Sequence, residues 1–184
     1  MLEKIITFDK KVLIFLNGLG SPTFDGLWLL ITKQVYWTPF FLLLAYLLYK
    51  KIGAKNLGTI VLFIAFILLC CNTSVEFFKS TFHRLRPCND PEINGIIRIV
   101  NQSDSFSFFS GHASNSMATM LFLYLILKKY YKYAFLIFLY PLIFAYSRIY
   151  LGVHFPTDIL TGYIFGATFG IVFYFFYQKY FNKY

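Results

Sequence analysis

The residues Ser147–Asp158, SRIYLGVHFPTD, join two strongly apolar segments and decide how the end of the chain folds. Gly152 is suited to end the helix before it, and Pro156 to begin the helix after it. Because the residue before a proline favours an extended conformation, His154 is predicted to lie on the connection between the two helices. Asp158 would then fall in the first turn of the second helix. Charged residues at membrane depth cost roughly 2.5 to 3.5 kcal/mol each on insertion scales, so a function is expected for them.

The composition is that of a membrane protein with several spans. Of the 184 residues, 58% are hydrophobic and 22% are aromatic, which lies outside the range of soluble domains. The net charge of +9 comes largely from basic residues at the ends of apolar segments, so the bilayer accounts for it and nucleic acid is not an expected partner. The cysteines form neither a CxxC pair nor an even set, which gives no reason to expect a disulfide framework or a zinc site. They are Cys70, Cys71 and Cys88.

Five apolar segments are interpreted as spans, and they cover residues 35–49, 57–78, 113–127, 133–150 and 156–177. Residues 1–34 are expected to form N-terminal amphipathic or interfacial helices, the second of which could lie in the interface, re-enter the membrane or begin a tilted span. The predicted fold is therefore all-α: a polytopic transmembrane helical bundle of about five to six spans plus an N-terminal amphipathic helix. Residues 1–184 would form a single integral-membrane domain.

The last span has a glycine at every fourth position, at Gly162, Gly166 and Gly170. Small residues at this spacing allow a neighbouring helix to approach closely. The alternative is that these glycines are only tolerated in a membrane helix.

Alternating the five spans across the bilayer gathers most lysines on one side, which is cytoplasmic by the positive-inside rule. These lysines are Lys50, Lys51, Lys55, Lys128, Lys129, Lys132, Lys179 and Lys183. The long polar segment 84–110 then forms an extracytoplasmic loop, and Cys88 within it should face the cell exterior or periplasm. His112 and His154 fall on the same face, which suggests a shared site.

Two stretches before the Ser147–Asp158 stretch carry groups that suit an anion. In KSTFHRLRP, residues 79–87, Lys79 and Arg86 could neutralise a phosphate from two directions, although basic residues beside a span are also common topology signals. In SFFSGH, residues 107–112, the Ser110 hydroxyl and the next two backbone N–H groups would lie at a helix N-terminus, where anions bind well. The alternative for this second stretch is an ordinary capping turn.

Within the Ser147–Asp158 stretch, Asp158 is close enough in sequence to orient the His154 ring, as a carboxylate does in a catalytic triad. A simpler interpretation is an acidic residue placed favourably against the helix dipole, and both can hold together.

These residues together make the sequence resemble the type 2 phosphatidic acid phosphatase superfamily of membrane lipid phosphatases. The signature of that family is K-x6-RP, then PSGH, then SR-x5-H-x3-D. The matching residues are Lys79, Arg86, Pro87, Ser110, Gly111, His112, Ser147, Arg148, His154 and Asp158. Phe109 stands where the family usually has a proline, which leaves the turn geometry before Ser110 undetermined.

The resemblance implies that His154 is the nucleophile and forms a phosphohistidine, that Asp158 orients it, and that His112 is the general acid for the leaving group. His112 would then act as the base that activates water. The residues implied to stabilise the phosphoryl oxygens are Lys79, Arg86, Arg148, Ser110 and Gly111. The resemblance implies neither a metal nor any other cofactor.

The implied substrate is a phosphorylated lipid: a polyprenyl diphosphate, lipid A, phosphatidylglycerol phosphate or phosphatidic acid. The small size and the outward-facing site favour the first two, in the inner (cell) membrane of a bacterium with the active site on the periplasmic or extracellular face. The oligomeric state is left open. A vanadium-dependent haloperoxidase resembles this family at the same phosphate pocket, but such enzymes are soluble and the five apolar spans argue against one. A catalytically inactive, lipid-binding membrane protein of the same fold is disfavoured because every motif histidine and arginine is present.

Overall fold

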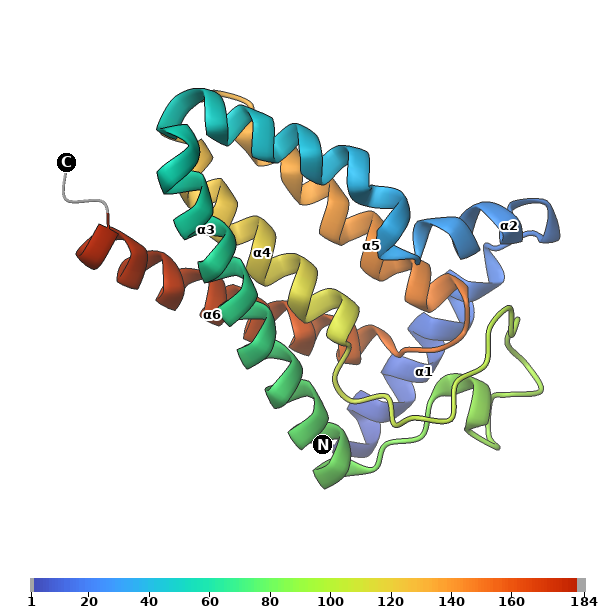
Figure 1. The fold of residues 1–184 in the computed structure, drawn as a ribbon. Helices are drawn as coiled ribbons and strands as arrows, with labels where there is room; N and C mark the ends of the chain where they lie inside the picture. The colour runs from blue at the N-terminus through green and yellow to red at the C-terminus, as the bar shows by residue number, and fades with distance from the viewer. Residues whose placement is uncertain (1, 182–184) are drawn as a thin grey trace.

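The computed structural model describes residues 2–181, which form helices and loops with no strand among them. The all-α prediction is therefore confirmed over this part of the chain, whereas Lys183 lies outside the described residues. In chain order the elements are α1 (Leu2–Gly18), α2 (Pro22–Ile31), the 3-10 helix η1 (Gln34–Trp37), α3 (Thr38–Phe82), the 3-10 helix η2 (Pro87–Asn89), α4 (Gly111–Leu127), the 3-10 helix η3 (Ala134–Phe138), α5 (Leu139–Tyr150) and α6 (Pro156–Phe181) (Figure 1).

The long element α3 consists of two helical arms that meet at Gly53. This glycine has φ 75° and ψ 172°, a backbone conformation that glycine adopts without steric cost. Figure 1 shows the first arm running to one end of the bundle and the second arm returning after a sharp bend. The sequence predicted separate segments at 35–49 and 57–78, and the structure confirms the break between them. Both arms, however, continue up to the bend without an intervening loop.

Close packing of α4 against α6 depends on the glycines of α6. A Cβ atom at Gly162 would lie 2.7 Å from the backbone oxygen of Ser110, and one at Gly170 would lie 2.8 Å from that of Ala118. Side-chain Cβ atoms essentially never approach a heavy atom within 3.0 Å, so only glycine fits at these positions. Gly166 likewise contacts the α4 backbone. The predicted small-residue stripe is confirmed, and it fixes the start of α4 beside the start of α6.

Helix α1 turns a polar stripe toward the bundle. Asp9, Leu13 and Asn17, spaced by four residues, are buried, whereas Phe8 and Phe15 on other faces are 69% and 66% exposed. The Asn17 side-chain amide donates to two backbone carbonyls near the end of α5, at 3.1 and 2.9 Å. An amphipathic helix was expected here. The structure shows that its inward stripe includes two polar residues and that its outward surface is largely apolar.

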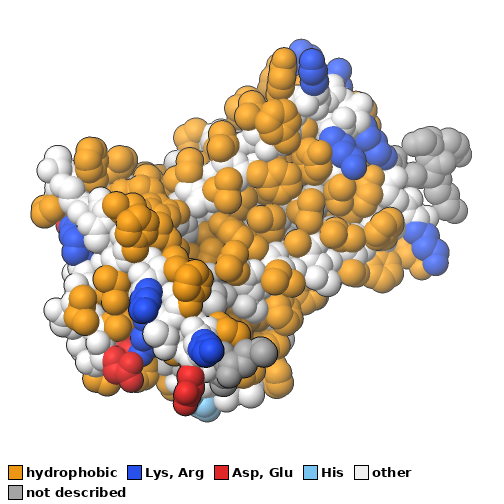
Figure 2. Space-filling model, turned by 180° about the vertical axis from the view of Figure 1, so that it is seen from behind, with side chains coloured by type: hydrophobic (Ala, Val, Ile, Leu, Met, Phe, Trp, Pro, Cys, Tyr) orange, Lys and Arg blue, Asp and Glu red, His pale blue; other side chains and the backbone are white. Residues whose placement is uncertain are grey.

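The outer surface carries a broad apolar region, with charged side chains gathered toward the two ends of the molecule (Figure 2). Two segments, residues 34–89 and 156–181, are long and apolar enough to cross a membrane, and 134–150 is a shorter apolar segment. The first of these segments contains both arms of α3. These lengths do not fix the number of spans, so five to six remains a prediction.

The two ends of the bundle differ in what they hold. The bend of α3 and the connection from α4 to η3 lie at one end, and the long loop of residues 83–110 lies at the other with α1 and α2 (Figure 1). The long loop meets the starts of α4 and α6 and the end of α5 at that second end. All three sequence motifs border this region.

Candidate active site

The connection between α5 and α6 is shaped by one glycine. Gly152 follows the end of α5 with φ 76°, and a Cβ atom there would lie 2.8 Å from the backbone oxygen of Arg98. Glycine is therefore required both by the backbone conformation and by the close approach of the loop. The chain then turns so that His154 points into the interior, and Pro156 begins α6 as the sequence predicted.

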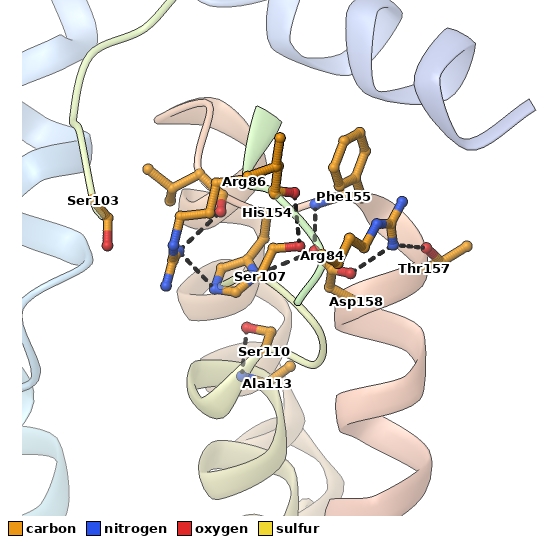
Figure 3. Close-up of polar contacts among 12 residues, drawn as sticks. Arg84, Arg86, Ser103, Ser107, Ser110, Ala113, His154, Phe155, Thr157 and Asp158 are labelled. Carbon is orange, nitrogen blue, oxygen red and sulfur yellow. Dashed lines mark hydrogen bonds and ion pairs between the residues drawn. The ribbon is translucent and has the colours of Figure 1, made fainter. Parts of the chain in front are cut away.

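His154 lies at the centre of the site and is only 2% exposed. On one side, Nη1 of Arg86 lies 3.1 Å from its Nε2 atom, and the same Nη1 donates to the backbone oxygen of Val153 at 2.9 Å. On the other side, Oδ2 of Asp158 lies 3.3 Å from its Nδ1 atom (Figure 3). The structure thus brings together one residue from the long loop, one from the connection and one from α6.

These contacts define the protonation of the His154 ring. An arginine can only donate, so Nε2 accepts from Arg86 and the proton lies on Nδ1, which donates to Asp158. Burial, together with the positive charges of Arg86 and Arg148, lowers the pKa of His154 to about 4, although the Asp158 carboxylate acts in the opposite direction. The ring is therefore neutral near pH 7. A nucleophilic histidine must be neutral with an unprotonated nitrogen, and here that nitrogen is Nε2.

Asp158 has little freedom to move, because its carboxylate is held on all sides. Oδ2 accepts from the backbone N–H of Phe155 at 2.9 Å as well as from His154. Oδ1 accepts from Nη1 of Arg84 at 2.7 Å. The side chain is fully buried. The predicted proximity of Asp158 and His154 is present in the structure.

Two buried arginines supply positive charge beside the ring. Arg86 is fixed by Ser105, which accepts from Nε through its backbone oxygen at 2.7 Å and from Nη2 through its hydroxyl at 2.8 Å. Burial lowers the pKa of Arg86, but an arginine remains charged in proteins. Arg148, at the end of α5, donates from Nη1 to the Thr32 hydroxyl at 2.6 Å, while its buried Nε has no hydrogen-bond partner. An unpaired buried donor costs about 1 to 3 kcal/mol, which a bound anion would relieve.

The start of α4 contributes backbone donors. Ser110 is the N-cap, and its hydroxyl accepts from the N–H of Ala113 at 3.4 Å. The N–H groups of Gly111 and His112 lie in the first turn of α4, where an N–H has no intrahelical acceptor. The N–H of Ser110 donates to the backbone oxygen of Asp158 at 3.1 Å, which joins the starts of α4 and α6. A Cβ atom on Gly111 would make only ordinary contacts, so the protein itself does not require glycine there.

The ring of His112 contacts a residue of α5 and the backbone just after α2. It stacks on Phe144 of α5 with ring centroids 4.8 Å apart, and it hydrogen-bonds to the backbone of Thr32 after α2. Arg148 and His154 both lie within electrostatic range of it. His112 is therefore part of the same cluster of groups, as the sequence predicted.

Lys79 has a different partner. Its Nζ atom lies 3.0 Å from Oε1 of Glu76, one turn earlier in α3, and this contact is an ion pair. Glu76 acts electrostatically on Arg86, so the pair lies within electrostatic range of the site. The structure joins Lys79 to Glu76 rather than to a residue of the other two motifs.

Three residues around the site were not predicted from the sequence: Asp9, Thr32 and Arg84. Thr32 contacts both Arg148 and His112, and Arg84 joins Asp9 of α1 to Asp158. The spacing of Asp9, Leu13 and Asn17 by four was the available signal for α1, because it places all three on one helix face. No comparable signal distinguishes Arg84 from the other basic residues that flank the span.

The fold and the site together define the class: a helical bundle with a buried His–Asp pair that two arginines face. Comparison with known proteins gives the family. A model of the PAP2 superfamily matches residues 57–182. Lipid A 4'-phosphatase of Bacteroides thetaiotaomicron is 34% identical, over 97% of this chain and 81% of that protein. Lipid A 4'-phosphatase of Porphyromonas gingivalis is 32% identical, over 92% of this chain and 72% of that protein.

Among solved structures, the crystal structure of a PAP2-type phosphatidylglycerolphosphate phosphatase from Bacillus subtilis superimposes with a TM-score of 0.74. Its sequence identity is 19%, and the alignment covers 98% of this chain and 90% of that one. The chain belongs to the PAP2 superfamily.

Proposed function

We propose that the protein is a phosphatase of the bacterial cell membrane that removes a phosphate from lipid A through a phosphohistidine at His154. The observation that carries this proposal is the state of His154: a neutral ring whose Nδ1–H donates to the Asp158 carboxylate and whose Nε2 lone pair is directed at Arg86. The names of the Bacteroides and Porphyromonas relatives favour lipid A as the substrate. A polyprenyl diphosphate is the second candidate.

In the first step, the phosphoryl group enters between Arg86 and the His154 ring, and the guanidinium moves from Nε2 onto the phosphoryl oxygens. Burial lowers the pKa of His112 to about 3, so its ring takes up a proton only when the negative phosphate lies beside it. Nε2 then attacks phosphorus as the bond to the lipid oxygen breaks, and His112 passes that proton to the leaving oxygen. Asp158 stabilises the positive charge that develops on the ring. In the second step, water attacks the phosphohistidine with His112 as its base, and inorganic phosphate leaves.

The charge on the transferring phosphoryl group is the main demand of this chemistry. The guanidinium groups of Arg86 and Arg148 would stabilise this negative charge, and the free N–H groups of Gly111 and His112 would donate to it from the N-terminus of α4. Lys79 would join them by exchanging Glu76 for a phosphoryl oxygen. We infer that these groups replace a metal ion, so the reaction should proceed without one.

An apolar cavity of about 370 Å³ supports a lipid rather than a soluble phosphate ester as the substrate. It lies between the arms of α3 and the helices α4 and α5, and its volume falls in the usual range of ligand sites. Phe144, which stacks on His112, forms part of its wall. Asn115 and Ser116, just after His112, give it a polar border, and its apolar lining includes Leu44, Leu48, Ile60, Ile64 and Leu123. An acyl chain would fit there with its phosphate toward the site.

The test is phosphate release by the purified protein in EDTA, with lipid A, a polyprenyl diphosphate, phosphatidylglycerol phosphate and phosphatidic acid compared at equal surface concentration. Lipid A should be the best substrate, and mass spectrometry should identify the phosphate that is lost. Lipid binding without release from any of the four would instead support an inactive lipid-binding protein. Release that requires added magnesium would contradict the proposed metal independence.

We also propose that the site faces the periplasm or cell exterior, because the lysine-rich turns lie at the other end of the bundle. Cys88 cannot report on this: it is buried against Tyr150 and Leu151, contrary to the expectation of an accessible loop thiol. Asp104 of the same loop is exposed, so Asp104→Cys with Cys88→Ser is the suitable probe. A membrane-impermeant maleimide should label it in cells with a permeabilised outer membrane. Labelling only after lysis of the inner membrane would reverse the orientation.

A further inference from the structure

An ion-pair network stands behind the His154–Asp158 pair. Arg84 of the long loop donates from Nη1 to Oδ1 of Asp158 and from Nη2 to Oδ2 of Asp9 in α1, both at 2.7 Å. The two carboxylates are 0% and 1% exposed, so a single guanidinium holds two buried negative groups. The carbon of that guanidinium lies 3.9 Å from the ring centre of Phe155. Figure 3 shows Arg84 on the side of Asp158 away from Arg86.

Asp9 also holds the start of the helix that carries Asp158. Its Oδ1 accepts from the backbone N–H of Thr157 at 2.9 Å. Pro156 has no N–H, so Thr157 carries the first donor of α6, and a carboxylate from another helix caps it. Arg84 reinforces this arrangement by donating to the Thr157 hydroxyl at 2.8 Å. Helix α1 is thereby joined to the first turn of α6.

We propose that Arg84 and Asp9 are positioning residues for phosphoryl transfer. Arg84 holds the Asp158 carboxylate in the orientation that accepts from Nδ1 of His154. Asp9 holds Arg84 in place, and its negative charge partly neutralises the guanidinium that faces Asp158. Helix α1 is then part of the catalytic apparatus as well as a surface helix. This inference rests on the proposed function, which assigns His154 and Asp158 their roles.

The two residues have opposite charges, so removing them should act on His154 in opposite directions. Without Arg84, the Asp158 carboxylate is less neutralised and favours a protonated ring, which raises the pKa of His154. Without the negative charge of Asp9, Arg84 acts more fully on Asp158, which lowers that pKa. The other charged or titratable groups that act on His154 are unchanged by either substitution; they are Arg86 of the loop, Arg148 of α5 and His112 of α4.

The experiment is a pH titration of the ring nitrogens by NMR on ¹⁵N-histidine-labelled protein in detergent micelles, with the His154 signals assigned by their loss in His154→Gln. Arg84→Gln should raise the His154 midpoint and Asp9→Asn should lower it. Both should reduce kcat by about 10- to 100-fold, with a smaller change in KM, because the reacting geometry is disturbed more than lipid binding. Arg84→Lys should recover the His154 midpoint but only part of the kcat.

Asp90→Asn is the matched control. It removes one of the two loop carboxylates that pair with Lys10 of α1, Asp90 at 2.7 Å and Glu92 at 2.8 Å, without touching Asp158. This variant should leave the His154 midpoint and kcat unchanged. Two results would show that the network only docks α1. One is a shift of the His154 midpoint in the same direction for Arg84→Gln and Asp9→Asn. The other is an unshifted midpoint in both variants, with kcat no lower than in Asp90→Asn.

If Arg84→Gln does not fold, the Asp9→Asn and Arg84→Lys titrations decide the question alone. The NMR titration needs no turnover, so it tests this inference even if the wild-type protein releases no phosphate. That second result would instead overturn the proposed function.

Discussion

Asp158→Asn is the substitution with the most specific expected effect, because it keeps the side-chain shape and replaces one acceptor oxygen with a donor group. In the wild type, Oδ1 accepts from Arg84, and Oδ2 accepts from both His154 and the N–H of Phe155. If the asparagine oxygen takes the Oδ1 position, its amide NH₂ meets two N–H groups. If it takes the Oδ2 position, the NH₂ meets the guanidinium. Either orientation sets donor against donor.

The first orientation is expected, because it keeps an acceptor for the charged Arg84 guanidinium. The ring of His154 can then relieve its clash only by moving its proton to Nε2. That proton would then point at Arg86, and no lone pair would remain to attack phosphorus. The equivalent change in a Ser-His-Asp triad lowers kcat by about 10⁴-fold through the wrong tautomer, so a loss of about 10³- to 10⁴-fold is expected here. Removing one partner of a buried ion pair also destabilises a protein by about 3 to 5 kcal/mol. A lower melting temperature should therefore accompany the loss of activity.

The assay measures kcat with lipid A and, separately, the thermal melting midpoint in the same detergent. The matched control is Asp25→Asn, which removes a carboxylate held by Arg98 at 2.8 Å where the aspartate side chain is 27% exposed. This carboxylate is partly exposed, although it also accepts from the Tyr150 hydroxyl at 2.8 Å, so the control should keep wild-type kcat and lower the midpoint less than Asp158→Asn does. Turnover by Asp158→Asn within about tenfold of the wild type would refute the tautomer argument.

Arg148→Lys should lose most activity although it keeps the charge, because lysine cannot make two parallel hydrogen bonds to a phosphate; a near wild-type kcat would refute this. His112→Ala should slow phosphoryl transfer from a lipid by about 10²- to 10⁴-fold but slow the nitrophenol burst from an aryl phosphate far less, because nitrophenolate leaves without a proton. Equal losses in a stopped-flow comparison would contradict that role. Gly166→Ala should cost about 1 to 3 kcal/mol of unfolding free energy because its Cβ would overlap the α4 backbone, whereas Gly58→Ala, which has open space, should not lower the melting midpoint. The pKa of His154, about 4 against an ordinary 6.5, means that the unfolded chain binds more protons between these values. Stability should therefore fall as the pH drops from about 6.5 to about 4, and melting curves of His154→Gln should lack this part of the decline.

Much of the site could be predicted because its residues lie at helix ends that the sequence marks clearly. Proline after His154 sets the start of α6, and the spacing to Asp158 places that carboxylate in its first turn. Alternation of the spans then brings His112 to the same face without any knowledge of packing. The site residues that lie at helix ends could therefore be predicted from the sequence.

What could not be predicted depends on how distant segments pack. Arg84 pairs with Asp9, 75 residues earlier, and a basic residue beside a span is equally well explained as a topology signal. The apolar face of α1 suggested a helix lying on the membrane surface, whereas its buried Asp9 and Asn17 bind α5, α6 and the loop. Cys88 was expected to be accessible because its loop is polar, but the loop folds back over the end of α5.

The central claim is that phosphate passes through a covalent bond to His154, and rapid quenching with ³²P-labelled lipid A tests it most directly. Acid-labile, alkali-stable label should appear on the wild-type protein, and peptide mapping by mass spectrometry should place it on His154. With a ³²P-labelled aryl phosphate, whose first step needs no acid, the label should accumulate in His112→Ala because the water step lacks its base. Label from either substrate should be absent from His154→Gln. Label on His112, or full turnover by a wild-type protein that never carries covalent phosphate, would contradict the account.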